Sequence, residues 1–142
     1  LKAGDPEKFP VKLAKAIKPQ RKGAAFVAVR RDGAVLLTKR SDKGLLAGMS
    51  CVPTTDWTAR QDGSIDDVSA PIAAAWTSCG SVRHVFTHFE LELSVFRATF
   101  SQAAPTGHWW SSAKDLPHEA LPTVFKKAIE LAIPDATRKA KP

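Results

Sequence analysis

The sequence has few cysteines and no long apolar segment, and both features narrow what the chain can be. Its two cysteines, Cys51 and Cys79, stand far apart with no Cys-x-x-Cys spacing. That arrangement argues against a zinc ribbon, an iron–sulfur cluster or a secreted disulfide framework. No apolar run approaches the ~20 residues of a membrane span, and no signal-peptide core is present. We therefore expect a cytoplasmic chain with no metal site and no membrane contact.

Methionine is scarce as well. Met49 is the single methionine, so Leu1 is not expected to be a translated start, and we expect the chain to be cut from a longer protein. The 142 residues are 44% hydrophobic and 25% charged, which is typical of one globular domain. A chain of this length buries roughly 68% of its unfolded surface and needs no covalent staples. No feature indicates an oligomer, so a monomer is expected.

Acidic residues are scarce in the first third of the chain. Residues 1–43 hold twelve Lys and Arg against four Asp and Glu, whereas the remainder holds nine against ten. Three prolines and a row of basic residues predict an extended basic linker over residues 1–22 that follows DNA phosphates without reading sequence. A solvated basic tail explains the same charges. The candidate phosphate contacts are Lys12, Lys15, Lys18, Arg21 and Lys22.

The domain is predicted to span residues 23–134, followed by a disordered tail over 135–142. Apolar β-type runs flank Asp32-Gly33, a pairing that predicts a hairpin. Further predicted elements are a short strand at 51–53, a mobile polar loop over 54–65, a short helix over 66–76, strand structure over 82–100 with one apolar face, and a helix opened by Pro122.

Several strings, in order, resemble the C-terminal domain of the bacterial A/G-specific adenine DNA glycosylases, the MutY family. The resemblance runs from about Phe9 to Ile133. The matching strings are Phe9-Pro10, Lys12, Arg21, Gly23-Ala24-Ala25-Phe26, Asp32-Gly33-Ala34-Val35-Leu36-Leu37, Lys43-Gly44-Leu45-Leu46-Ala47-Gly48-Met49, Val52-Pro53, His84-Val85-Phe86-Thr87-His88-Phe89 and Leu121-Pro122-Thr123-Val124.

The resemblance implies an α+β, Nudix-like fold in which a mixed β-sheet is sandwiched between helices. It also implies an N-terminal glycosylase domain, absent from these residues, that carries the catalytic residues and an iron–sulfur cluster. The fragment itself is expected to hold no cofactor and to have no catalytic residues. Its expected partners are that domain and double-stranded DNA containing 8-oxoguanine opposite a mispaired adenine, which the parent would excise in base excision repair. The resemblance therefore places the parent at the bacterial nucleoid.

The resemblance marks Phe86-Thr87-His88 as the segment that approaches the oxidised guanine. Oxidation turns N7 of guanine from an acceptor into a donor, so a hydroxyl that accepts from N7–H could distinguish the lesion. Thr87 supplies that hydroxyl, Phe86 could stack on bases, and His88 could orient the loop or touch a phosphate. An ordinary strand turn with Phe86 in the core is the competing interpretation.

Other residues have weaker assignments. Arg83, and less so His84, could hold a phosphate of the lesion strand, or could lie on an exposed sheet face. Lys39, Arg40 and Lys43 lie near glycines that permit either close DNA approach or a tight loop, and both interpretations stay open. The apolar string 45–49 could face DNA or the missing domain. Core packing is the default for it and for Trp76, Trp109 and Trp110, but less so for Trp57 in its polar loop.

Two other functions compete with DNA reading. An active Nudix hydrolase needs a helix whose glutamates hold Mg²⁺ against a pyrophosphate, but no glutamate occurs between Gly48 and Gly80. The four aspartates of that stretch do not reproduce the required spacing. A protein-interaction module, using the 54–65 segment or the basic linker, is the other alternative.

Overall fold

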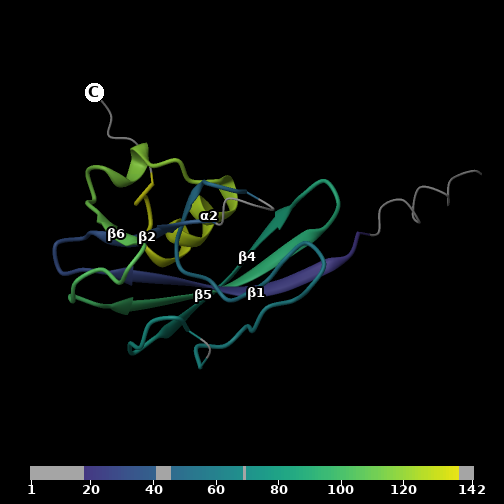
Figure 1. Ribbon diagram of the computed structural model, residues 1–142, viewed down its shortest axis with the longest axis horizontal. Coiled ribbons are helices and arrows are strands. Elements are labelled where there is room, and N and C mark those ends of the chain that lie inside the picture. Colours follow the sequence, from purple (N-terminus) through teal and green to yellow (C-terminus); the bar gives the residue numbers. More distant parts are fainter. Residues whose placement is uncertain (1–17, 41–45, 69, 138–142) are drawn as a thin grey trace, which may run out of the picture.

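A β-hairpin opens the described part of the chain. The computed structural model describes residues 18–40, 46–68 and 70–137 (Figure 1). Strand β1 (Gln20–Val29) turns into β2 (Val35–Lys39), with Gly33 at a φ of 93°. Arg30 donates to Asp32, and this hydrogen bond, with one from the Ala34 amide, lowers the pKa of Asp32 to about 2. The predicted Asp-Gly hairpin is confirmed.

The described strands form one mixed sheet in the order β3-β2-β1-β5-β4, with β6 paired to β2. Strands β1 and β5 run parallel, in register over ten pairs from Gln20↔Glu90 to Val29↔Thr99. Figure 1 shows β1, β5 and β4 side by side, with β2 and β6 near the Val29 end of β1. The remaining bounds are β3 (Ser50–Cys51), β4 (Thr77–Val85), β5 (Glu90–Thr99) and β6 (His108–Ser111).

A helix covers one face of this sheet. Helix α2 (Thr123–Ala132) follows Pro122 and buries one side, including Phe125 and Ile129, against Leu91 and Leu93 of β5. The 3.6-residue spacing of its apolar positions accounts for this packing. A short 3-10 turn, η1 (Leu116–His118), precedes it. In the described ranges no helix is long and apolar enough to cross a bilayer.

The opposite face lacks the helix that we predicted over 66–76. In the described residues this segment is irregular, and it brings Ile72 and Trp76 onto Ala28 and Leu36 of the sheet. Pro71 has no amide hydrogen to donate and disfavours a helical conformation at the residue before it. The indole of Trp76 donates to the Ile72 carbonyl at 3.0 Å. The predicted α+β fold with a mixed sheet is thus confirmed, with one α-helix in the described part of the chain rather than helices on both faces.

The segment 54–65, predicted to be a mobile loop, is hydrogen-bonded to β1. Thr55 Oγ1 accepts from the Ala24 amide at 3.0 Å and donates to the Ser64 carbonyl at 2.6 Å, and the Gly63 amide donates to the Lys22 carbonyl at 2.7 Å. Trp57 packs across Gly23 and is 2% exposed. The interpretation that Trp57 was the tryptophan least suited to core packing is therefore wrong, because its polar neighbours form the outer rim while its ring turns inward.

Both expected boundaries of the domain differ from the observed elements. Strand β1 begins at Gln20, so the last three residues of the predicted linker pair with β5. Beyond α2, the amides of Asp135 and Thr137 donate to the Glu130 carboxylate at 2.8 and 2.7 Å, so the first residues of the predicted disordered tail are held in place. Residues 1–17, with Lys12 and Lys15, and residues 138–142 lie outside the described residues.

Candidate nucleic-acid interface

The predicted lesion-reading segment is the exposed tip of the β4–β5 hairpin. The Phe86 amide donates to the Phe89 carbonyl at 2.8 Å, which closes the turn. Phe86 stacks on the buried Phe89 with ring centroids 4.7 Å apart, so the half-buried Phe86 anchors the turn. Thr87 and His88 are exposed beyond this aromatic base. We call Phe86–His88 the 86–88 loop; it presents a free hydroxyl and an imidazole on a rigid support.

The 86–88 loop lies next to the point where the described chain enters the sheet. Lys18 Nζ donates to the Phe86 carbonyl at 2.9 Å. Arg21 Nε donates to the Ala59 carbonyl at 3.1 Å, and Ala59 lines a cavity of about 280 Å³ together with residues 86–89. Two of the predicted phosphate contacts, Lys18 and Arg21, therefore lie beside the 86–88 loop.

Arg83 and Lys22, in contrast, lie among carboxylates. Arg83 is opposite Glu92 in the β4–β5 register, and its Nη1 is 3.9 Å from a Glu90 carboxylate oxygen. Lys22 is the register partner of Glu92 on the other side of β5. Strand alternation puts these side chains on the sheet face away from α2. Arg83 therefore lies exposed on the sheet face away from α2, and its contact with a phosphate stays a prediction.

His84 of β4 and Lys127 of α2 lie on the α2 side of the β4–β5 hairpin. His84 shares the α2 side of the sheet with its register partner Leu91, and its ring meets Phe86 edge-on at 4.6 Å between centroids. Lys127 Nζ donates to the Arg83 carbonyl at 2.9 Å and lies 3.5 Å from His84 Nδ1. Burial, followed by the charge of Lys127, lowers the pKa of His84. The sequence offered no signal for this long-range contact.

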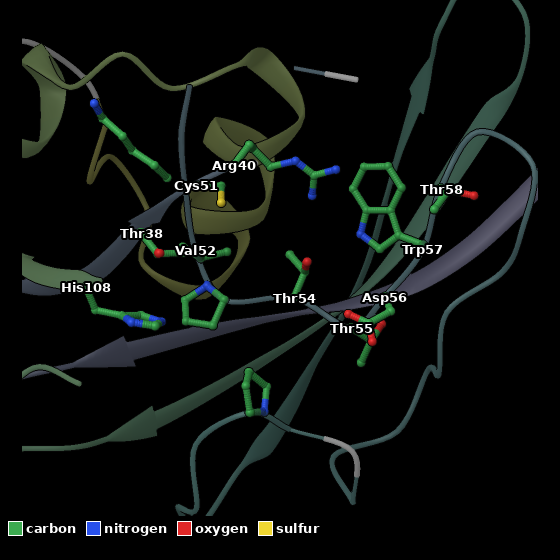
Figure 2. A pocket seen from close by; sticks show the side chains of 13 residues that line it. Thr38, Arg40, Cys51, Val52, Thr54, Thr55, Asp56, Trp57, Thr58 and His108 are labelled. Atoms are coloured by element: carbon green, nitrogen blue, oxygen red, sulfur yellow. The ribbon is translucent and has the colours of Figure 1, made fainter. Parts of the chain in front are cut away.

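A separate groove of about 370 Å³ runs between β2, β3 and the 54–58 segment. Figure 2 shows Arg40 extending toward the Trp57 ring, with Thr54 below them. The Arg40 guanidinium carbon is 4.6 Å from that ring centroid, which is a cation–π geometry. Trp57 Nε1 is buried with no hydrogen-bond partner among the described residues. The Arg40 side chain thus packs on the buried Trp57 ring.

Cys51 lines this groove, and Leu46 packs on the hydrophobic core. Burial raises the pKa of the Cys51 thiol to about 11, so it is protonated at neutral pH. Leu46 packs partly buried on the core, as expected by default. Lys43 and Leu45 lie outside the described residues. Across the described ranges, no three His, Cys, Asp or Glu side chains come close enough to hold a metal ion.

The comparisons with known proteins agree on the fold. A family model for the NUDIX domain matches residues 24–131. The C-terminal domain of mouse MUTYH, solved in complex with human PCNA, is similar at a TM-score of 0.65 and 22% identity, covering 85% of this chain and 92% of that one. The MutT protein from Methanosarcina mazei Go1 is similar at 0.63 and 20%, covering 80% and 92%.

A MutT NUDIX hydrolase from Burkholderia pseudomallei is also similar, at a TM-score of 0.62 and 22% identity, covering 80% of this chain and 98% of that one. No curated protein sequence matches the chain significantly. At these identities the likeness establishes the fold, and the function has to be argued from the site.

Proposed function

Because the chain belongs to the Nudix domain family, we propose that it uses this fold to read DNA damage, recognising 8-oxoguanine opposite adenine as the C-terminal domain of an adenine DNA glycosylase. The single observation that carries the proposal is the 86–88 loop: an exposed Thr87 hydroxyl on a hairpin tip held by the Phe86–Phe89 stack. The likeness to the MUTYH C-terminal domain supports it. Excision of adenine belongs to a glycosylase domain outside these residues, with its iron–sulfur cluster.

The chemistry of the lesion matches that of the loop. Guanine N7 is an acceptor, whereas N7–H of 8-oxoguanine is a donor. The Thr87 hydroxyl oxygen accepts a hydrogen bond from N7–H of 8-oxoguanine, whereas the same oxygen lone pair faces an acceptor at N7 of guanine unless the hydroxyl rotates to donate its own hydrogen. The loop backbone is held by the Phe86–Phe89 hydrogen bond and by Lys18, so little ordering remains to be done on binding. Lys18 and Arg21 add attraction to phosphates without regard to sequence.

A Thr87 pair of variants tests the proposal. Thr87→Val keeps the branched shape and removes the hydroxyl, whereas Thr87→Ser keeps the hydroxyl. One hydrogen bond contributes about 0.5–1.5 kcal/mol, so the valine variant should lose roughly two- to tenfold in preference for an 8-oxoguanine:adenine duplex over a guanine:adenine duplex. The serine variant should retain that preference. The measurement is fluorescence anisotropy with both duplexes.

Equal preference in wild type and Thr87→Val would remove Thr87 from lesion reading. The same titration followed by backbone amide shifts locates the contact, because lesion-specific shifts should fall on residues 86–88. If both duplexes shift only the basic residues before β1, the chain binds DNA without reading the lesion.

A further inference from the structure

A basic pair lies on the helix side of the 86–88 loop and has no role in the function proposed above. Lys127 on α2 reaches the edge strand β4, where its Nζ is 2.9 Å from the Arg83 carbonyl and 3.5 Å from His84 Nδ1. His84 in turn packs edge-on against Phe86. Lys127 and His84 therefore connect helix α2 to Phe86 of the 86–88 loop through successive side-chain contacts.

The positive charge of Lys127 is not neutralised within the described residues, where no carboxylate lies within ion-pair distance of it. Arg83, three residues before the loop, is on the other face of the sheet, with its Nη1 3.9 Å from a Glu90 carboxylate oxygen. Near the end of β4, Lys127 thus lies on the α2 side and carries a charge that no carboxylate of the described residues pairs. Lysine binds phosphate as a mobile point charge and can exchange a carbonyl for a phosphate oxygen.

His84 adds a directed donor. Lysine has donors only, so its 3.5 Å contact with Nδ1 suits the tautomer that carries its hydrogen on Nε2. The lowered pKa of His84 favours the neutral ring, which has one donor and one acceptor. The Lys127 ammonium and the His84 N–H can both donate hydrogen bonds to the oxygens of a phosphodiester group. They lie beside the exposed 86–88 loop.

We propose that Lys127 and His84 form a binding site for one DNA backbone phosphate next to the nucleotide that the 86–88 loop reads. This proposal rests on the proposed function for the identity of the ligand. With Lys18 bound to the Phe86 carbonyl, the loop has one lysine held at its tip and another at the end of the strand that leads into it. The contact carries no sequence information and fixes the position of the duplex.

The test compares Lys127→Gln with Lys126→Gln in the full chain. Glutamine can still donate to the Arg83 carbonyl, so the first variant removes charge and keeps the edge contact. Lys126 is an exposed neighbour on the same helix and provides the matched loss of charge. Affinity for a guanine:adenine duplex and an 8-oxoguanine:adenine duplex is measured by fluorescence anisotropy between about 50 and 200 mM KCl.

The Lys127→Gln variant should reduce the slope of log affinity against log salt by about 0.9, so its deficit relative to wild type shrinks roughly 3.5-fold over this range. The deficit should be the same on both duplexes, and Lys127→Arg should restore binding. Lys126→Gln should leave the slope unchanged. Equal effects of the two glutamine variants, or no effect of either, would overturn the proposal.

His84→Phe keeps the ring packing and removes the donor. Because both residues hold the same phosphate, its effect and that of Lys127→Gln should be less than additive in the double variant; additive losses would contradict a shared site. The lesion preference of the wild type reports separately on the proposed function. Loss of that preference with the Lys127 effect intact refutes lesion reading alone, whereas a wild type that binds neither duplex refutes both.

Discussion

Two effects lower the pKa of His84, namely its partial burial and the nearby charge of Lys127. Partial burial disfavours the charged ring, and the Lys127 ammonium repels it, so both lower the pKa. A base with a lower pKa in the folded state binds fewer protons there than in the unfolded chain. Its contribution to stability is therefore complete above the unfolded pKa of 6.5 and is lost as the pH falls through 6.5 toward the folded value.

Removing the charge of Lys127 should raise the pKa of His84. In Lys127→Gln the repulsion is gone and the burial remains, so the pKa of His84 should rise toward 6.5 without reaching it. Imidazole shifts in an NMR pH titration measure it. Lys126→Gln serves as the control and should leave the His84 titration where it is in the wild type. A fall in the His84 pKa would show that the two side chains do not interact as described.

Single residues were predicted unevenly from the sequence. The buried alternation of Leu91, Leu93 and Val95 follows from period-two patterning, and the structure confirms it. Trp57 could not be placed in this way, because its burial depends on Gly23, more than thirty positions earlier. The carboxylates beside Arg83 could not be predicted, because they are set by the register between β4 and β5, for which the sequence has no local signal.

At the scale of elements, β1 supports the segment 54–65 through a close contact. Gly23 has no side chain, and the Trp57 ring occupies the space where a Cβ would be, with Trp57 Cγ only 2.9 Å from that position. The Thr55 and Gly63 hydrogen bonds fix the segment on either side of the tryptophan. The strand and the segment therefore form one packed unit.

Gly23→Ala should destabilise the domain by about 1–3 kcal/mol, because the added methyl group forces the indole or the strand to shift. Urea unfolding followed by tryptophan fluorescence and circular dichroism measures the loss. In a Trp57→Leu background the same substitution should cost less, since the smaller side chain leaves room, and a double-mutant cycle isolates that coupling. An equal cost in both backgrounds would place the strain elsewhere.

Elements with their own local signals were predictable, and those defined by tertiary packing were not. The Asp32-Gly33 hairpin and helix α2, with its Pro122 start and apolar face, have such signals. The stretch over 66–76 was misinterpreted because aspartates and alanines favour a helix locally. In the molecule Pro71 and the burial of Ile72 and Trp76 prevail over that propensity.

The molecule as a whole has the Nudix fold, and its sequence carries no glutamate between Gly48 and Gly80. In the described residues this stretch holds hydrogen-bonded turns and the irregular cover of the sheet. The hydrophobic patterns and motifs of the sequence predicted the fold. The lack of glutamates between Gly48 and Gly80 is a separate observation, and it concerns the hydrolase alternative.

Incubation with oxidised dGTP and Mg²⁺ should accordingly release no more phosphate or pyrophosphate than a protein-free control, because no row of glutamates is available to hold the metal against the pyrophosphate. Product formation is followed by chromatography, with an active Nudix hydrolase as the positive control. Magnesium-dependent release in proportion to protein concentration would restore the hydrolase alternative.

The entry of the chain into the sheet has a mechanical consequence. Lys18 holds the Phe86 carbonyl, and the Pro19 carbonyl accepts from the Glu90 amide, so the first two described residues are tied to opposite ends of the hairpin turn. Tension along the preceding chain therefore acts on the hairpin tip directly, without passing through the hydrophobic core.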